Sequence, residues 1–283
     1  GWQNNQPMGM HRDFKYIENI KEELTEAGEW YFSNKEKRAY VIPHPATRLN
    51  QEPAEAAINH CFFEFSGCAS IHIEGIQFER SSRTFMETKE PLLRSDWTIF
   101  RGGAILFKQS SNCTITKCNF FDIGSNAIFV DGKNNDIVIS KCHFNTIGAS
   151  AICFVGRNDS VRSPLFKPAA HQHINDIDLT PGPASDNYPH HCRVEECLIE
   201  KVGYLEKQAT GVELSMAHAC AIINTSIYDT SRAAINISEG TFGGHLIDGC
   251  DCFDTVKETG DHGSFNSWGR DRFWHLDGLP DDE

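Results

Sequence analysis

The chain of 283 residues lacks several features that would assign it to common protein classes. No apolar run reaches the length of a membrane span, and no basic-plus-apolar signal segment opens the sequence. Lysine and arginine (26) are outnumbered by aspartate and glutamate (39), which gives a net charge of −13. This charge disfavours nucleic acid or an anionic membrane as a partner. No stretch shows sustained helical periodicity with caps, so we do not expect a helical fold.

Several motifs of catalysis and cofactor binding are absent as well. There is no glycine-rich phosphate loop, no nucleophile elbow and no zinc-binding helix motif, and we predict neither a cofactor nor a metal. The eleven cysteines are odd in number and contain no Cys-x-x-Cys pair. We therefore expect buried free thiols rather than disulfides or metal ligands.

What the chain does contain is a motif that returns about every 24 residues, with apolar, polar and apolar positions followed by a small residue or cysteine. Self-similarity at a short period indicates stacked units that cannot bury their apolar face alone. The copies are Ile115–Phe120, Val138–Phe144, Val194–Ile199, Ile222–Ile227 and Ile247–Cys252, with a degenerate copy at Ile73–Phe78.

Each copy is followed by a second short apolar segment, and residues typical of turns lie between them. These segments are Ala127–Val130, Ala151–Phe154, Gly211–Leu214, Ala234–Ile237 and Gly263–Asn266. Short strands without helices predict an all-β fold, a right-handed parallel β-helix, whereas the regular pattern of a leucine-rich repeat is missing. Like positions stack in such a solenoid, so one inward column is expected from Cys118, Cys142, Cys197, Thr225 and Cys250.

The organisation along the chain suggests an N-terminal accessory region and a solenoid. Residues 1–60 contain a short helix or strand near Ile17–Leu24, then hairpin strands at Gly28–Phe32 and Arg38–Pro43. Residues 61–283 hold the coils, with insertions near 80–100 and 157–191 that we expect on one face, often the binding face. The first and last residues resemble the interior of a longer protein, so we expect a fragment whose last coil is uncapped.

The segment Glu258–Trp274 is the densest in groups that could carry chemistry. A cluster of carboxylates, histidine, arginines and tryptophans is typical of a binding or catalytic site, although a salt-bridged loop that caps a coil is the alternative. We predict catalytic roles for Asp261 and Asp271. Hydroxyl recognition is assigned to His262, Asn266 and Arg270, and stacking on a sugar ring to Trp268.

A strand also delivers Glu239 to its end, directly before a glycine. Two carboxylates that flank a sugar linkage are what glycoside hydrolysis needs, so Glu239 is the third predicted catalytic residue. Glu213 and Asn236 occupy the same position in neighbouring coils and are predicted to bind substrate, although a simple exposed strand residue is the alternative for Glu213.

Two further segments are weaker candidates. The loop Arg83–Trp97 carries aromatic and charged residues and is expected to wall a groove. The second insertion is rich in histidine, and its members His171, His173, His190 and His191 fit a flexible rim better than a metal site.

Several of these motifs resemble those of bacterial right-handed parallel β-helix glycosidases, most closely glycoside hydrolase family 141, which includes α-L-fucosidases and xylanases. The motifs are Glu22–Leu24, Gly28–Tyr31, Thr84–Glu87, Ser95–Trp97, Asn236–Gly244 and Gly260–Gly263. The resemblance spans nearly the whole chain and implies paired carboxylates in a cleft along the solenoid. It does not say which residues form the pair.

Three functions stay open on the sequence. The first is a glycoside hydrolase that acts on a plant-type or other complex polysaccharide, or on its oligosaccharides. The second is a polysaccharide lyase or uronate epimerase, for which Arg270, Arg272 and His262 could supply a cation and a base. The third is a non-catalytic β-helix that binds glycan. Work on polysaccharide favours export and many free thiols favour a reducing compartment, so localisation also stays open, as does the oligomeric state.

Overall fold

The computed structural model describes residues 18–48, 51, 55–93, 97–166, 173–240, 242–259 and 262–268. The described residues fall into two compact units, one before Ala57 and one from Ala57 onward. The first unit contains the 3-10 helix η1 (Lys21–Glu23) and an antiparallel hairpin of β1 (Trp30–Ser33) and β2 (Arg38–Val41). The predicted hairpin is confirmed.

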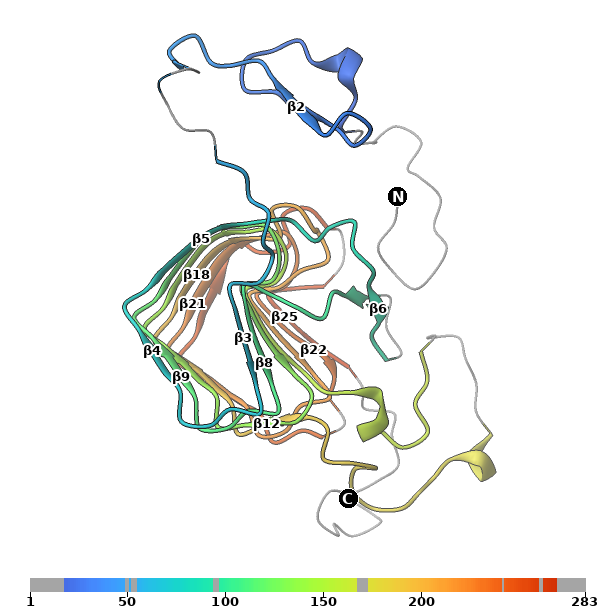
Figure 1. Cartoon of the computed structure of the whole chain (residues 1–283). Coiled ribbons are helices and arrows are strands. Elements are labelled where there is room, and N and C mark those ends of the chain that lie inside the picture. The colour runs from blue at the N-terminus through green and yellow to red at the C-terminus, as the bar shows by residue number, and fades with distance from the viewer. Residues whose placement is uncertain are drawn as a thin grey trace. The chain divides into compact units, whose positions relative to one another are not determined.

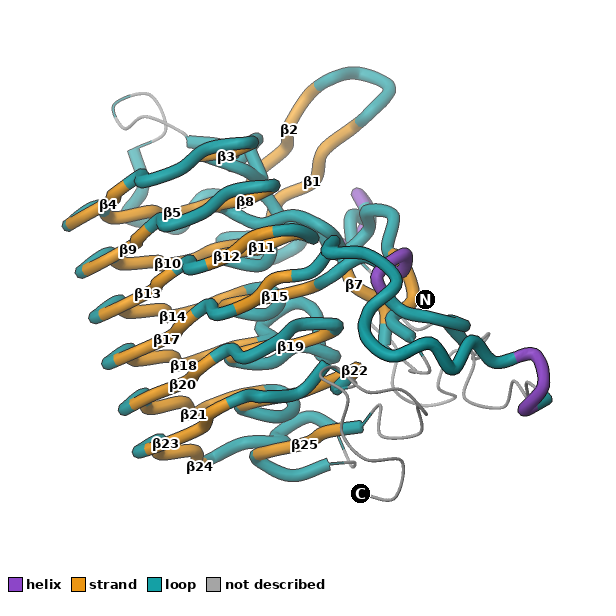
Figure 2. The backbone as a smooth tube through the Cα atoms, turned by 90° about the horizontal axis from the view of Figure 1, so that it is seen from below, coloured by secondary structure: helices purple, strands orange, loops and turns teal. Residues whose placement is uncertain are grey.

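The second unit is a solenoid of three parallel sheets, in which strands stack rung upon rung (Figure 1 and Figure 2). The predicted all-β, right-handed parallel β-helix is confirmed. The first sheet has seven strands: β3 (Phe63–Ser66), β8 (Ile105–Lys108), β11 (Ile128–Asp131), β15 (Ile152–Val155), β19 (Val212–Ser215), β22 (Ile235–Glu239) and β25 (Phe265–Ser267).

The second and third sheets have six strands each. The second sheet contains β4 (His72–Glu74), β9 (Thr114–Thr116), β13 (Val138–Ser140), β17 (Arg193–Glu195), β20 (Ala221–Ile223) and β23 (Leu246–Asp248). The third contains β5 (Gln77–Ser81), β10 (Asn119–Ile123), β14 (His143–Ile147), β18 (Leu198–Val202), β21 (Ser226–Thr230) and β24 (Asp251–Phe253).

The repeated sequence motif is the corner between the second and third sheets. The residue at this corner is left-handed in every rung, with φ of 47–54° at Lys117, Lys141, Glu196 and Asn224. Glycine, which adopts this conformation without strain, fills the same corner at Gly75 and Gly249. The cysteine that follows the corner then points into the solenoid. Because each rung has one such corner, the motif returns once per rung.

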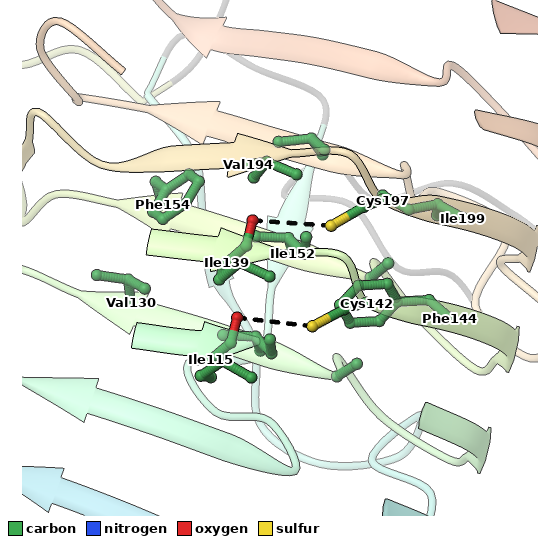
Figure 3. Packing of buried hydrophobic residues seen from close by; sticks show 14 of the residues in the cluster. Ile115, Val130, Ile139, Cys142, Phe144, Ile152, Phe154, Val194, Cys197 and Ile199 are labelled. Carbon is green, nitrogen blue, oxygen red and sulfur yellow. Dashed lines mark hydrogen bonds between the residues drawn. The ribbon is translucent and has the colours of Figure 1, made fainter. Parts of the chain in front are cut away.

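The interior is apolar, and its side chains stack from rung to rung (Figure 3). The predicted inward column is confirmed: Cys118, Cys142, Cys197 and Thr225 are buried, and Cys250 is half-buried. The thiol of Cys142 donates to the carbonyl of Ile115 (3.6 Å), and that of Cys197 donates to the carbonyl of Ile139 (3.7 Å). All eleven cysteines are free thiols, as expected. Burial raises the pKa of Cys118, which makes its thiol a poor nucleophile.

The outer face of the first sheet is also covered. The covering segment (residues 84–93 and 97–101) carries β6 (Glu90–Pro91) and β7 (Thr98–Ile99), which pair with each other. Its apolar side chains form a second cluster with outward residues of the sheet. The members from the covering segment are Leu92, Leu93, Trp97 and Ile99, and those from the strands include Leu106, Phe129, Cys153 and Val155. The loop predicted to wall a groove thus packs onto the sheet face.

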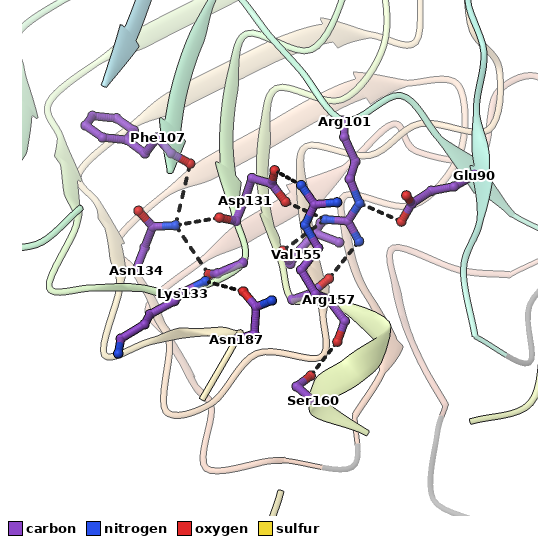
Figure 4. Close-up of polar contacts among 12 residues, drawn as sticks. Glu90, Arg101, Phe107, Asp131, Lys133, Asn134, Val155, Arg157, Ser160 and Asn187 are labelled. Carbon is purple, nitrogen blue, oxygen red and sulfur yellow. Dashed lines mark hydrogen bonds and ion pairs between the residues drawn. The ribbon is translucent and has the colours of Figure 1, made fainter. Parts of the chain in front are cut away.

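Ion pairs fasten the two insertions to this face (Figure 4). Asp131, at the end of β11, binds Arg101 of the covering segment (2.7 Å) and also contacts Arg157 of the second insertion. Arg101 in addition donates to Glu90 (2.6 Å) and to the carbonyl of Gly156 (2.7 Å). The second insertion carries η2 (Asn158–Ser160) and η3 (Ile174–Asp176), and β16 (Pro189–His190) at its end pairs with β12 (Asn134–Asn135). Among the described residues, no helix is long and apolar enough to cross a membrane.

Candidate functional site

The outer face of the first sheet changes from apolar to polar along the solenoid. The strand registers place one outward residue per rung in a single column. In chain order this column reads Leu106, Phe129, Cys153, Glu213, Asn236 and Asn266. The last three are residues that the sequence predicted for a site, and the structure stacks them on neighbouring rungs.

Hydrogen bonds join these polar side chains into a chain. Asn266 Nδ2 donates to Asn236 Oδ1 (2.7 Å), and Asn236 Nδ2 donates to Glu213 Oε2 (2.9 Å). Ser238 Oγ accepts from Asn236 Nδ2 (2.6 Å) and bonds Glu213 Oε1. We call these four residues, together with Glu239, which follows Ser238 in the chain, the outer polar cluster.

Glu213 is fully buried within this cluster, with 0% of its surface exposed. Burial raises its pKa to about 8, although hydrogen bonds from Ser238, Asn236 and Thr210 and the charge of Arg232 act in the opposite direction. Because desolvation of the charged form outweighs these contacts, the carboxyl group keeps its proton at neutral pH. The alternative of an exposed strand residue at this position is therefore wrong.

Glu239 lies at an irregularity of the first sheet. Between β19 and β22 the register shifts, so that Leu214 pairs with Ile237 but Ser215 pairs with Glu239. On the other side, Trp268 N donates to the carbonyl of Ile237 (3.0 Å), while Gly240 N donates to that of Trp268 (2.9 Å). Ser238 and Glu239 thus form a β-bulge against both neighbouring rungs. Bulges of this kind re-aim side chains and are common next to active sites. Glu239 is 1% exposed.

A buried arginine lies near the same cluster. The guanidinium of Arg232 stacks over the ring of Trp97 (4.9 Å to the centroid) and contacts Nε2 of His262. Since arginine can only donate, His262 Nε2 is the acceptor in this contact. His262 also meets the Trp268 ring edge-on at 6.4 Å between centroids.

A buried ion pair fixes the covering segment beside this region. Lys89 Nζ lies 3.1 Å from Glu206 Oε1, and both side chains are less than a tenth exposed. Burial raises the pKa of Glu206, and the nearby charge and hydrogen bond of Lys89 only partly offset it. A pair in this setting fixes the position of the covering segment.

Six of the nine predicted site residues lie in the described part of the chain. Glu213, Asn236, Glu239 and Asn266 are together in the outer polar cluster, and His262 and Trp268 contact each other. Asp261, Arg270 and Asp271 lie outside the described residues, and so do His171 and Arg272. His190 and His191 contact each other through their Nδ1 atoms (2.8 Å) at the end of the second insertion, and His173 is exposed.

Sequence reasoning missed Lys89, Glu206, Arg232 and Ser238. Lys89 and Glu206 come from connections more than a hundred residues apart, and no local pattern links them. For Arg232 a signal was present, because this charged residue directly precedes the apolar strand segment that starts at Ala233. In the described parts of the chain, no group of three or more histidine, cysteine, aspartate or glutamate side chains could hold a metal ion.

Comparison with known proteins supports the architecture and leaves the chemistry open. Residues 52–164 match the family described as right handed beta helix region. No curated protein matches the chain.

Proposed function

We propose that this protein is a glycoside hydrolase that acts on a complex polysaccharide, of plant type or another kind, or on its oligosaccharides. Glu213 is the proton donor of the proposed reaction and Glu239 is the second carboxylate. The observation that carries the proposal is that two glutamates of one sheet face lie on neighbouring rungs, and that the surroundings of Glu213 raise its pKa to about 8. Cleavage of a glycosidic bond needs this pairing of an acid and a carboxylate.

The spacing of the two glutamates fits the proposal. Glu213 pairs with Asn236, and Ser215 pairs with Glu239, so the two acids are diagonal neighbours, one rung and two residues apart. With rungs about 4.8 Å apart and a rise of about 3.3 Å per residue, their backbone positions are separated by roughly 8 Å. This backbone spacing lets the two side chains reach opposite sides of one glycosidic bond. We propose inversion at the anomeric carbon, for which the two carboxyl groups would stand about 6.5–9.5 Å apart with a water between them.

The resemblance to glycoside hydrolase family 141 supports the same reaction class. Under this proposal, Asp261 and Asp271 are alternatives to Glu239 as the second carboxylate. Arg270, His262 and Asn266 bind sugar hydroxyls, and Trp268 stacks on a ring. Because Glu213 and Glu239 are both enclosed in the structure, binding of substrate must displace part of their cover.

The test is hydrolysis of a panel of polysaccharides and oligosaccharides, followed as release of reducing ends. Glu213→Gln and Glu239→Gln are each expected to lower kcat by about a thousandfold or more. The matched control is Glu200→Gln, which changes a glutamate on the outer face of the third sheet and should leave the rate unchanged. Full activity in both Glu213→Gln and Glu239→Gln would remove the assignment, and Asp261→Asn and Asp271→Asn would then be tested in the same way.

One observation favours a second candidate, a polysaccharide lyase or uronate epimerase. The imidazole of His262 contacts the guanidinium of Arg232, and an imidazole and a guanidinium are the base and the cation that proton abstraction next to a carboxylate requires. An unsaturated product that absorbs ultraviolet light would identify a lyase, and a change in the uronate composition of the polymer would identify an epimerase. Binding of glycan without any turnover would leave the non-catalytic alternative.

A further inference from the structure

Three residues on successive rungs surround the bulge of the first sheet. Ser215 pairs with Glu239 on one side, and backbone hydrogen bonds to Ile237 and Gly240 place Trp268 opposite the bulge on the other. All three lie on the outer face, where Trp268 packs against the second apolar cluster. Their side chains therefore share one region of the structure, although Ser215 and Trp268 are more than fifty residues apart in the chain.

Two polar atoms in this region have no hydrogen-bond partner among the described residues. These are the hydroxyl Oγ of Ser215 and the indole Nε1 of Trp268, and both atoms are buried. Ser215 as a whole is 0% exposed. A buried polar group without a partner destabilises a protein by about 1–3 kcal/mol, so such groups usually mark a bound water or ligand.

The chemistry of these groups restricts what can bind between them. The indole N–H only donates, so the guest must accept a hydrogen bond. As the base of the proposed reaction Glu239 is ionised and only accepts, so the guest must also donate, while the hydroxyl of Ser215 can do either. The enclosure of both orphaned atoms requires a small guest. Water meets all of these requirements, whereas an anion cannot donate to Glu239 and a cation cannot accept from Trp268.

We propose that Ser215 and Trp268 position the water molecule that attacks the sugar, with Glu239 as the base that activates it. This inference rests on the proposed function. In the step, the water oxygen forms a bond to the anomeric carbon while the bond from that carbon to the glycosidic oxygen breaks. One proton of the water passes to Glu239, and the departing oxygen takes the proton of Glu213. The hydroxyl of Ser215 and the indole N–H of Trp268 are positioning groups that act on the water, while the Trp268 ring keeps the stacking role proposed above.

The first test requires no substrate. A high-resolution crystal structure of the full chain is expected to show an ordered water within hydrogen-bond distance of Ser215 Oγ, Trp268 Nε1 and the carboxylate of Glu239. The same structure of Ser215→Ala is expected to show this water displaced or at reduced occupancy. A site that is dry in the unchanged protein overturns the proposal, whether or not the protein hydrolyses glycans.

The second test separates a positioning role from a structural one. Ser215→Ala and Trp268→Phe are each expected to lower kcat about tenfold and to change KM less than about twofold. Ser215 acts on the water alone, and phenylalanine keeps an aromatic ring for stacking while it removes the N–H. Ser215→Thr keeps the hydroxyl and should recover most of the rate. The matched control is Thr98→Val, which removes another buried hydroxyl without a described partner, on a different strand, and should leave kcat unchanged.

The outcomes distinguish the two levels of the argument. An ordered water with unchanged kcat in both variants shows a structural water only and overturns the positioning role, while the proposed function stands. Absence of hydrolysis on every substrate, with the water in place, overturns the proposed function and the positioning role with it. Equal loss of rate in Ser215→Ala and Ser215→Thr also contradicts the proposal, because the hydroxyl would then not be the group that acts.

Discussion

The two faces of the first sheet differ in what their residues must do, although both are buried. On the inner face, β11, β15, β19 and β22 present only apolar side chains at alternating positions. On the outer face, the same strands run from Phe129 and Cys153 to Glu213 and Asn236. The inner face is buried by the coil itself, so every rung faces the same constraint. The outer face is buried by insertions, which differ from rung to rung.

This difference explains where chemistry can develop in a solenoid. An inward residue stacks on copies of itself, as Phe120 does on Phe144 at 4.7 Å between ring centroids, and a polar group would break that stack. An outward residue is covered by an insertion that does not repeat, so the polarity and burial of its surroundings can differ from rung to rung. Glu213 is protonated at neutral pH because of such an environment, while Glu200, on the less buried outer face of the third sheet, is not. Burial pushes the pKa of Glu200 up, but hydrogen bonds from Tyr228, His143 and Asn145 together bring it below the ordinary value.

The largest effect we expect is a pH dependence of stability caused by Glu213. Because its pKa is raised to about 8, the folded protein retains a proton that the unfolded chain releases above a pH of about 4.3. The free energy of unfolding is therefore expected to fall as pH rises from about 4.3 to 8, by on the order of 5 kcal/mol, and to level off above that. Urea unfolding across this range should show the slope, and Glu213→Gln should abolish it.

Glu200→Gln is the control of opposite sign. Because the pKa of Glu200 is lowered, its carboxylate stabilises the folded protein above the ordinary pKa of glutamate. This stabilisation is lost as the pH falls and the carboxylate is protonated. This variant should therefore leave the slope between pH 4.3 and 8 in place. An unchanged slope in Glu213→Gln would show that another group causes it.

Removal of an inward aromatic ring should cost nearly as much. Phe120 stacks between Phe78 and Phe144 and is fully buried, so Phe120→Ala is expected to destabilise the protein by roughly 3–4 kcal/mol. Phe253→Ala, which truncates an aromatic side chain that is 52% exposed, should cost far less. Denaturant unfolding monitored by circular dichroism measures both, and equal losses would contradict the importance that we assign to the inner stack.

A smaller loss is expected when the ion pair that holds the covering segment is broken. Lys89→Met leaves Glu206 buried without its cation and should destabilise the protein by roughly 3 kcal/mol. Combining it with Glu206→Leu should recover most of that loss, because the uncompensated charge is then removed. Hydrogen exchange is expected to rise first in the covering segment. If the double variant were as unstable as the single one, packing rather than charge would explain the effect.

The inner face could be predicted from the sequence because its pattern is local and repeated. Cys118, Cys142 and Cys197 recur at a fixed position after a left-handed corner, and each rung repeats the same requirement. The stacking of Glu213 on Asn236 followed from the same period, since residues one repeat apart become neighbours, and the structure adds Asn266 to this column. The period therefore predicted the fold, the interior and the core of the candidate site.

The cover of the outer face could not be predicted in this way. Contacts such as Lys89 with Glu206, or Trp97 with Arg232, join segments whose distance along the chain is unrelated to the length of the repeat. The alternative of an exposed strand residue at Glu213 was wrong for this reason, because nothing in the strand sequence shows that an insertion folds back onto it. The bulge at Glu239 was also invisible, since a single inserted residue leaves no mark in an imperfect repeat.

The smallest effect should come from exchanging one member of the inward column for another. Thr225 occupies the position that cysteine fills in neighbouring rungs, and its hydroxyl donates to the carbonyl of Ile223 at 2.9 Å. The thiol of Cys197 lies 3.3 Å from the carbonyl of Glu195, the equivalent position, as well as near that of Ile139, so it shares its one proton between the two. Cys197→Thr should therefore change the free energy of unfolding by less than about 1 kcal/mol. Cys197→Leu, which overfills the same space, should cost about 1–3 kcal/mol in the same unfolding assay. Equal losses for both would mean that the thiol itself, and not its size and hydrogen bond, is what the column requires.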